Sequence, residues 1–208
     1  MAQLFSIHPD NPQLRLLRQA AQIVDAGGVA AIPTDSCYAF ACRPGDKSAV
    51  DRIRRIRQID ERHHLTLLCR DLSEISIYAR VDNATYRLLR LATPGPYTFI
   101  LEATREVPRR LSHPSRKTIG IRVPAHLVAL GLLEQVGHPL IGSTLQLPGD
   151  PLPLNDAAAI RARLEHELDV VIDSGNCGLQ PTTIIDLSAR EAQVMRRGLG
   201  PLEPLGLA

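Results

Sequence analysis

The chain has 208 residues, of which 44% are hydrophobic, 22% are charged and only 3% are aromatic. This length suits one large domain or two small ones, and the composition is that of a globular protein with an aliphatic core. No apolar run is long enough for a membrane span, and residues 1–10 lack the basic and apolar stretches of a signal peptide. Four cysteines without a C-x-x-C pair are too sparse for a disulfide framework, so we expect reduced thiols and a cytoplasmic protein.

The formal net charge of +2 is unevenly distributed along the chain. Residues 43–70 contain eight Lys or Arg against four Asp or Glu, and residues 105–122 contain six against one. Two such basic segments either converge on one anionic ligand or form solvated faces on separate elements.

The hydrophobic pattern predicts strands and helices that alternate along the chain. We expect the first helix to be capped by Asn11, to open with Pro12 and to end at Gly27-Gly28. A second helix starts at Asp46. The other elements predicted in this half are strands at residues 3–7, 29–33, 39–42 and 65–69 and short helices at 72–78 and 84–91.

The second half continues this alternation after a rigid turn at residues 93–96. The strands at 182–187 and 193–196 follow each other closely, so some antiparallel pairing is expected. We therefore predict a single α/β domain over residues 1–208, with a mixed sheet and a loose tail at 199–208. The remaining elements predicted are strands at 97–102, 117–123, 139–143 and 170–173 and helices at 127–136 and 156–167.

A polar loop follows the buried strand at residues 29–33. Thr34, Asp35, Ser36 and Tyr38 place two hydroxyls, a carboxylate and a phenol within a few positions. Ligands bind at strand ends in open α/β sheets, although the same residue types are also ordinary turn formers.

Four arginines lie at positions where contact with an anion would account for their positive charge. Arg55 and Arg57 lie near a helix C-terminus, where the helix dipole alone favours cations. Arg122 and Arg196 interrupt strand patterns, so each needs a partner anion or an exposed edge. Guanidinium groups match phosphate and carboxylate oxygens bidentately, which makes a phosphate-bearing ligand the functional interpretation.

Other motifs are weak. The loop at residues 142–149 is rich in glycine and hydroxyls and could present backbone N–H groups to phosphate, but it is not a Walker A loop. The seven histidines, including adjacent His63 and His64, lack paired ligand spacing, so we predict scattered surface histidines and no metal site. A nucleophile elbow of the G-x-S-x-G type is also missing from the sequence.

Taken in order, these segments resemble the YrdC-like family, which includes bacterial threonylcarbamoyl-AMP synthases. The resemblance is strongest to the YciO branch, on residues 7–12, 54–58, 107–111 and 116–120. The family order runs through Pro33-Thr34-Asp35-Ser36-x-Tyr38, Arg55-x-Arg57, Pro94-Gly95-Pro96-x-Thr98, Gly120-x-Arg122-x-Pro124, Ser143-Thr144-x-Gln146, Thr182-Thr183-Ile184-Ile185-Asp186 and Arg196-x-Gly198.

The resemblance implies a twisted, mixed parallel and antiparallel sheet with helices on its faces and a basic concave cleft. It implies an enzyme that condenses L-threonine, bicarbonate and ATP to threonylcarbamoyl-AMP and pyrophosphate, with Mg²⁺ bridging phosphate oxygens. That product feeds threonylcarbamoyladenosine formation in tRNA. Family members are also described as binders of double-stranded RNA.

The resemblance also implies roles for ten residues. Arginines would neutralise the threonine carbamate and the α-phosphate that it attacks. The catalytic group is expected to be Arg55, Arg57, Thr144 and Gln146, and the substrate-binding group Thr34, Tyr38, Thr98, Arg122, Thr182 and Arg196.

Three positions depart from the synthase pattern. Arg55 stands in place of a Lys, Gln146 in place of an Asn, and Gln58 in place of a Pro. An amide displaced by about an ångström can cost on the order of a hundredfold in rate. Two alternatives therefore stay open, namely a protein that binds double-stranded RNA or tRNA without synthase activity and a hydrolase of threonylcarbamoyl-AMP or a related adenylate. The sequence predicts no membrane partner and leaves the oligomeric state undefined.

Overall fold

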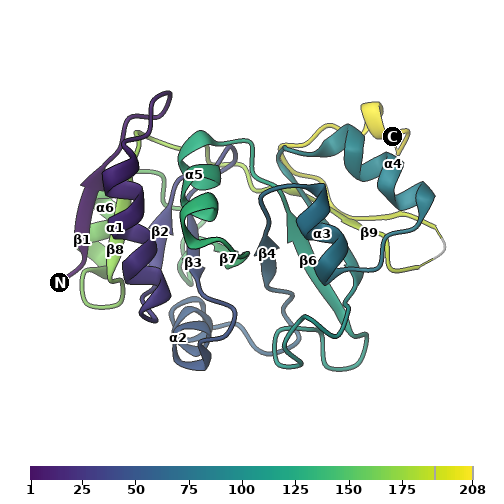
Figure 1. Cartoon of the computed structure of the whole chain (residues 1–208), viewed down its shortest axis with the longest axis horizontal. Helices are drawn as coiled ribbons and strands as arrows, with labels where there is room; N and C mark the ends of the chain where they lie inside the picture. The colour runs from purple at the N-terminus through teal and green to yellow at the C-terminus, as the bar shows by residue number, and fades with distance from the viewer. Residues whose placement is uncertain (190, 208) are drawn as a thin grey trace.

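Ten strands form one sheet in the computed structural model, which describes residues 1–189 and 191–207 (Figure 1). Their order across the sheet is β1-β8-β2-β3-β7-β4-β6-β5-β9-β10. The strands are β1 (Gln3–Ser6), β2 (Ala30–Ile32), β3 (Ala39–Cys42), β4 (Thr66–Leu68), β5 (Tyr97–Glu102), β6 (Thr118–Arg122), β7 (Leu140–Thr144), β8 (Val170–Asp173), β9 (Thr183–Asp186) and β10 (Gln193–Arg196).

The sheet is mixed, as predicted. The parallel pairs are β1 with β8, β2 with β8, β4 with β6 and β5 with β9, and the remaining neighbours are antiparallel. β9 and β10 pair in the antiparallel sense predicted, with an irregular register between Val194 and Arg196. Arg196 stands opposite Ile184, so Met195 is the extra residue of a bulge that turns Arg196 toward the face of Ile184.

Within residues 1–189 and 191–207, six α-helices and one 3₁₀ turn accompany the strands. Asp46 caps its helix as predicted, with its side chain accepting from the Ala49 N–H at 2.9 Å. The bounds are α1 (Leu14–Asp25), α2 (Lys47–Arg57), α3 (Leu72–Tyr78), α4 (Asn83–Ala92), α5 (Leu127–Val136), α6 (Ala157–Leu164) and η1 (Glu203–Leu205).

Two predicted helix ends are wrong. The first helix begins at Leu14, after Gln13, because the His8 ring accepts the Asp10 and Asn11 N–H groups and closes a separate turn before it. Helix α6 ends at Leu164 rather than at residue 167, because the chain turns there and the N–H groups of residues 167 and 168 both bond back to the Leu164 carbonyl.

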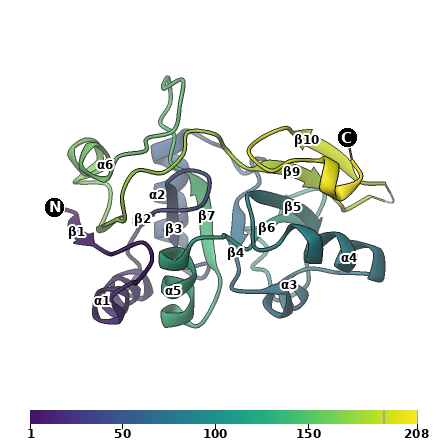
Figure 2. The same cartoon turned by 90° about the horizontal axis from the view of Figure 1, so that it is seen from above.

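The helices cover the two faces of the sheet unequally. Figure 2 shows α1 and α5 on one side of β3 and β7 and α2 on the other. The core beneath α1 and α5 includes Leu17 and Leu132 and extends only as far as Leu68 of β4. Within the described residues, no side chain of β5, β6 or β9 belongs to this core. The same face of the sheet is therefore left uncovered at these strands, where a cavity can form.

The predicted loose tail is wrong for residues 199–207, and residue 208 lies outside the described residues. Leu202 is buried, the Tyr97 hydroxyl donates to the Pro201 carbonyl at 2.8 Å, and η1 packs on α4. The apolar side chains of this short segment find partners on α4 that no local pattern reveals.

The core is mainly aliphatic, as predicted, although Tyr38, Phe40 and Phe99 are also fully buried. The four cysteines are free thiols. Of the helices in the described part of the chain, none has the length and apolar character needed to cross a bilayer.

Candidate functional site: an arginine-lined cavity

A cavity of about 310 Å³ lies on the uncovered part of the sheet, near the ends of β7 and α2. Strand side chains alternate between the two faces of a sheet, so alternate residues of β4 and β5 point into it, namely Thr66 and Leu68, and Thr98 and Ile100. Of the described residues that line it, four are arginines and none is acidic. Its floor and walls include Tyr38, Arg57, Arg62, His63, His64, Thr66, Leu68, Thr98, Ile100, Arg122, Ser143, Thr144, Gln146, Thr182, Ile184, Met195 and Arg196.

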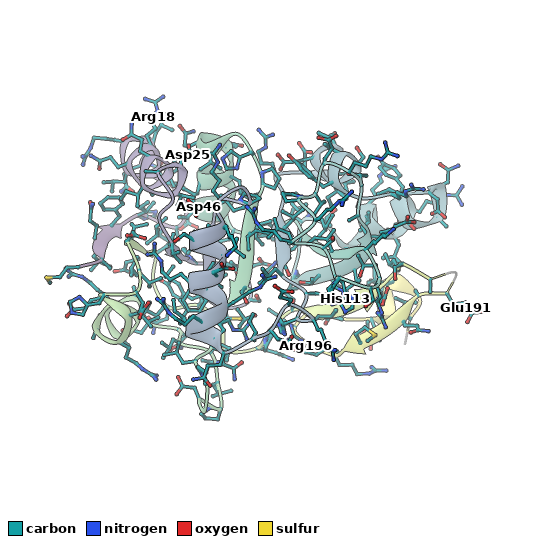
Figure 3. The ribbon with its side chains drawn as sticks, turned by 90° about the horizontal axis from the view of Figure 1, so that it is seen from below. Arg18, Asp25, Asp46, His113, Glu191 and Arg196 are labelled. Atoms are coloured by element: carbon teal, nitrogen blue, oxygen red, sulfur yellow. The ribbon has the colours of Figure 1, made fainter. Side chains whose placement is uncertain are left out.

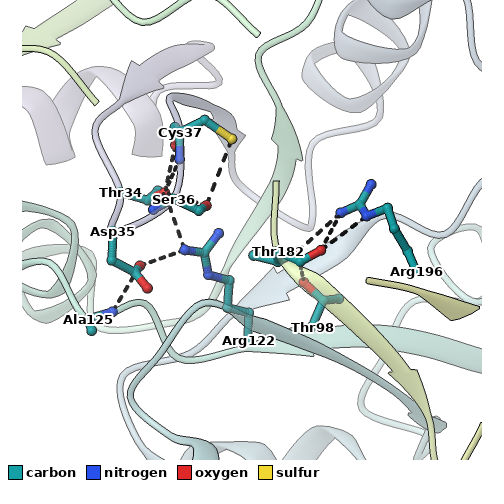
Figure 4. A network of polar contacts seen from close by, with 9 residues as sticks. All are labelled: Thr34, Asp35, Ser36, Cys37, Thr98, Arg122, Ala125, Thr182 and Arg196. Carbon is teal, nitrogen blue, oxygen red and sulfur yellow. Dashed lines mark hydrogen bonds and ion pairs between the residues drawn. The ribbon is translucent and has the colours of Figure 1, made fainter. Parts of the chain in front are cut away.

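Arg122, at the end of β6, is held by the loop that follows β2. Its Nη2 donates to Asp35 Oδ1 at 2.5 Å and lies 3.3 Å from Thr34 Oγ1 (Figure 4). The side chains of Arg122 and Asp35 are only 7% and 12% exposed. Asp35 Oδ1 also accepts from the Ala125 N–H at 3.0 Å, whereas Arg122 Nε is buried without a partner in the described structure. The strand arginine therefore has the partner anion that its apolar setting requires.

Thr34 builds the turn of this loop and does not line the cavity. Its hydroxyl donates to the Cys37 carbonyl at 2.6 Å and accepts from the N–H groups of Ser36 and Cys37. The turn-forming and functional interpretations of the loop are thus compatible, because the turn places Asp35 against Arg122.

The loop at residues 174–178, which follows β8, packs against the loop that follows β2. The Tyr38 hydroxyl donates to the Gly175 carbonyl at 3.0 Å, and burial raises the pKa of Tyr38. A Cβ atom at Gly178 would clash with the Ser36 carbonyl oxygen, so the two loops touch through backbone. Tyr38 therefore lines the cavity with a hydroxyl that is already engaged.

Arg57 reaches the cavity from the last turn of α2. Its Nη1 donates to Ser143 Oγ at 2.5 Å, and burial, with a smaller effect of Arg196, lowers the pKa of Arg57. Gln58 ends the helix in the left-handed conformation, at φ 51° and ψ 43°. The chain turns there and carries residues 62–64 along the rim.

Arg196 enters from β10, where the bulge directs it inward. Its Nε and Nη2 donate to the Thr182 carbonyl at 3.0 and 2.9 Å, and burial lowers the pKa of Arg196. The Thr182 hydroxyl lies 2.9 Å from the Thr98 hydroxyl, across the parallel pair β5–β9. Figure 3 shows Arg196 between the end of α2 and the β9–β10 hairpin.

The profile of the Sua5/YciO/YrdC family, described as "Telomere recombination", matches residues 22–198. The chain belongs to this family. It is 51% identical to YciO of Escherichia coli (strain K12), over 98% of this chain and 99% of that protein. The crystal structure of E. coli YciO superimposes with a TM-score of 0.95, covering 99% of this chain and 100% of the other.

More distant family members carry functional names. A threonylcarbamoyl-AMP synthase of Chromobacterium violaceum is 34% identical over 87% of this chain and 93% of its own length. The structure of P. abyssi Sua5 complexed with L-threonine is 25% identical and has a TM-score of 0.88, covering 96% of this chain and 58% of that one. The mixed sheet with helices on its faces is the fold of this family.

Eight of the ten residues implied by the family resemblance line this cavity. Besides those described above, Thr144 is half-buried at its edge, and the Gln146 side chain donates to the Asp150 carbonyl at 2.9 Å. Thr34 lies behind the cavity, in contact with Arg122. The catalytic and binding roles of these residues stay predictions.

Arg55 points away from the cavity into solvent. Its side chain is 68% exposed and pairs with Glu167 at 2.7 Å. Residues two apart on a helix point in different directions, so Arg57 faces the cavity while Arg55 faces solvent.

Arg62, His63 and His64 line the cavity. His63 is exposed, as the sequence predicts for its histidines, whereas His64 is half-buried. His64 Nε2 lies 2.9 Å from Thr118 Oγ1, and its ring stacks on that of His113 at 4.9 Å. Desolvation, followed by His113, lowers the pKa of His64. The sequence offered one signal for these three residues, their position in the chain a few residues after Arg57.

Proposed function

We propose that the chain is an enzyme of the threonylcarbamoyl-AMP synthase type, which uses L-threonine, bicarbonate and ATP. The observation that carries this proposal is the cavity, where arginines from α2, β6 and β10 meet hydroxyl groups without any acidic side chain in the described lining. Support comes from relatives named threonylcarbamoyl-AMP synthase and from a family structure with bound L-threonine.

The electrostatics suit a reaction between two anions. Threonine carbamate has to approach an α-phosphate that is itself negatively charged, so fixed cations that hold both reactants supply much of the rate. Arg122 is compensated by Asp35, and the net positive charge therefore comes from Arg57, Arg62 and Arg196. Arg122 lines the cavity as well, held in place by its pair with Asp35.

The paired hydroxyls of Thr98 and Thr182 supply a further donor. Only one hydroxyl hydrogen is used between the two oxygens, and Arg196 Nη2 lies 3.3 Å from Thr182 Oγ1. The second hydroxyl hydrogen is free to bind a carboxylate or phosphate oxygen.

Magnesium belongs to the nucleotide in this proposal. Groups of three or more His, Cys, Asp or Glu side chains suited to a metal ion do not occur in the described part of the chain, and no carboxylate from it lines the cavity. The residues present therefore do not form a magnesium site, and Mg²⁺ would enter on the phosphates of the ATP substrate.

Purified protein incubated with ATP, labelled L-threonine, bicarbonate and Mg²⁺ should form threonylcarbamoyl-AMP and pyrophosphate. Arg57→Ala should lower kcat/KM by about a hundredfold or more, because a charge-assisted donor at the reacting phosphate is lost. Arg18→Ala is the matched control, since Arg18 is an exposed arginine of α1 (Figure 3).

Absence of product from the wild-type protein would overturn the proposal. Consumption of added threonylcarbamoyl-AMP without its synthesis would support the hydrolase instead. Salt-sensitive binding of duplex RNA without either reaction would support the RNA-binding alternative.

A further inference from the structure

His63 lies at the cavity on the segment that follows α2. The described structure gives its ring no hydrogen-bond partner, and only its backbone N–H is engaged, by Asp60. The charged groups that face it are Arg57 of α2, Arg196 of β10 and Asp60 of its own loop. An imidazole free at both nitrogens, beside the arginines of the cavity, is placed to exchange a proton with a bound ligand.

The other titratable groups of the cavity are poorly suited to accept a proton. Burial raises the pKa of Cys37 and of Tyr38, and the Tyr38 hydroxyl is already donated to the Gly175 carbonyl. His64 is tied to Thr118 and stacked on a second histidine. Carboxylates are missing from the described lining, so His63 is the remaining candidate base.

The proposed reaction needs such a base. Threonine is an ammonium ion at neutral pH, and its nitrogen has no lone pair until a proton leaves. We infer that His63 is the general base that deprotonates the amino group of threonine, an assignment that rests on the proposed function.

The step balances without any further reagent. The His63 ring takes one proton from the ammonium group, and the amine nitrogen then attacks the carbon of bicarbonate. The new N–C bond forms as the C–OH bond breaks, and the hydroxyl leaves as water with a second proton from nitrogen. The carbamate is left to attack the α-phosphate, while the imidazolium returns its proton to solvent.

The surroundings favour the neutral form of the imidazole. Partial desolvation at the cavity, followed by Arg57 and Arg196, lowers the pKa of His63, and this outweighs the opposite effect of Asp60. A base must be unprotonated to act, so kcat/KM for threonine should rise with pH through a limb below about 6.5, the ordinary value for histidine.

The test compares wild type, His63→Gln and His166→Gln across pH 5.5–9.5 at one fixed bicarbonate concentration, so that the chemistry of the buffer is shared. We expect His63→Gln to lower kcat/KM by about a hundredfold at neutral pH, which is the size of a general-base contribution. The acid limb should move from below about 6.5 up to the pH at which the threonine amine itself deprotonates, so that activity recovers only at high pH. His166 is 78% exposed on the far turn after α6 and should behave as wild type.

Two further measurements separate catalysis from folding. Stabilisation by ATP in a thermal-shift assay should be the same in His63→Gln as in wild type, and added imidazole should restore activity to His63→Ala. An unchanged acid limb in His63→Gln, or no rescue by imidazole, would overturn the assignment while leaving the synthase proposal intact. A wild-type protein that makes no product would instead remove the proposed function, and the assignment with it.

Discussion

Replacing Asp35 with alanine removes the carboxylate that compensates Arg122 in the wall of the cavity. The two side chains are 12% and 7% exposed, and the joining N–O distance is 2.5 Å. The substitution leaves a guanidinium in a place from which water is nearly excluded. Breaking a buried ion pair from one side costs about 3–5 kcal/mol, against a total stability of about 5–15 kcal/mol for a typical domain.

Two related variants divide this cost into its parts. Asp35→Asn keeps an oxygen that can accept from the Ala125 N–H, so it should lose only about 1.5–3 kcal/mol, the value of a hydrogen bond to a charged group. The double variant Asp35→Ala/Arg122→Met removes both charges and should cost less than the sum of the single variants, because no charge is left buried alone.

Urea unfolding followed by circular dichroism gives these free energies of unfolding. The control is Asp51→Ala, which breaks an exposed ion pair with Lys47 and should cost no more than about 1 kcal/mol. Two results would contradict this reasoning: a loss of unfolding free energy for Asp35→Ala no larger than for Asp51→Ala, or a loss for the double variant equal to the full sum of the single variants. Either would mean that Asp35 does not stabilise the buried charge of Arg122.

Three other substitutions test local features by the same unfolding measurement. Gln58→Gly should raise stability by about 0.5–1 kcal/mol, because Gln58 has a φ of 51° and only glycine adopts this region without a steric penalty; a decrease would contradict this. Tyr38→Phe should lower stability by about 1–2 kcal/mol, because the Gly175 carbonyl loses its partner within a buried contact, and an unchanged midpoint would show that water replaces the hydroxyl. Arg55→Ala should change stability by less than about 1 kcal/mol, as expected for the exposed pair with Glu167, and a larger loss would indicate that α2 depends on this pair.

Local pattern determined much of this protein before any long-range contact was known. Alternating side chains and turn residues placed most strands and helices within a few residues, because these periods depend only on neighbours in the chain. The same pattern marked Arg122 as a charge that needs an anion, and the order of short motifs indicated the family. Errors occurred where a local turn or a distant partner changed the outcome, as at Asn11 and in the tail beyond residue 198.

Only the tertiary structure decided which of these residues meet. Asp35 and Arg122 are 87 positions apart in the chain. They come into contact only because the sheet sets β7, β4 and β6 side by side next to β3. The helical rotation of α2 separates Arg55 from Arg57, and one extra residue in β10 directs Arg196 inward. His63 lies on a segment without a period, so its place at the cavity follows from the end of α2 and the packing of the sheet rather than from its neighbours.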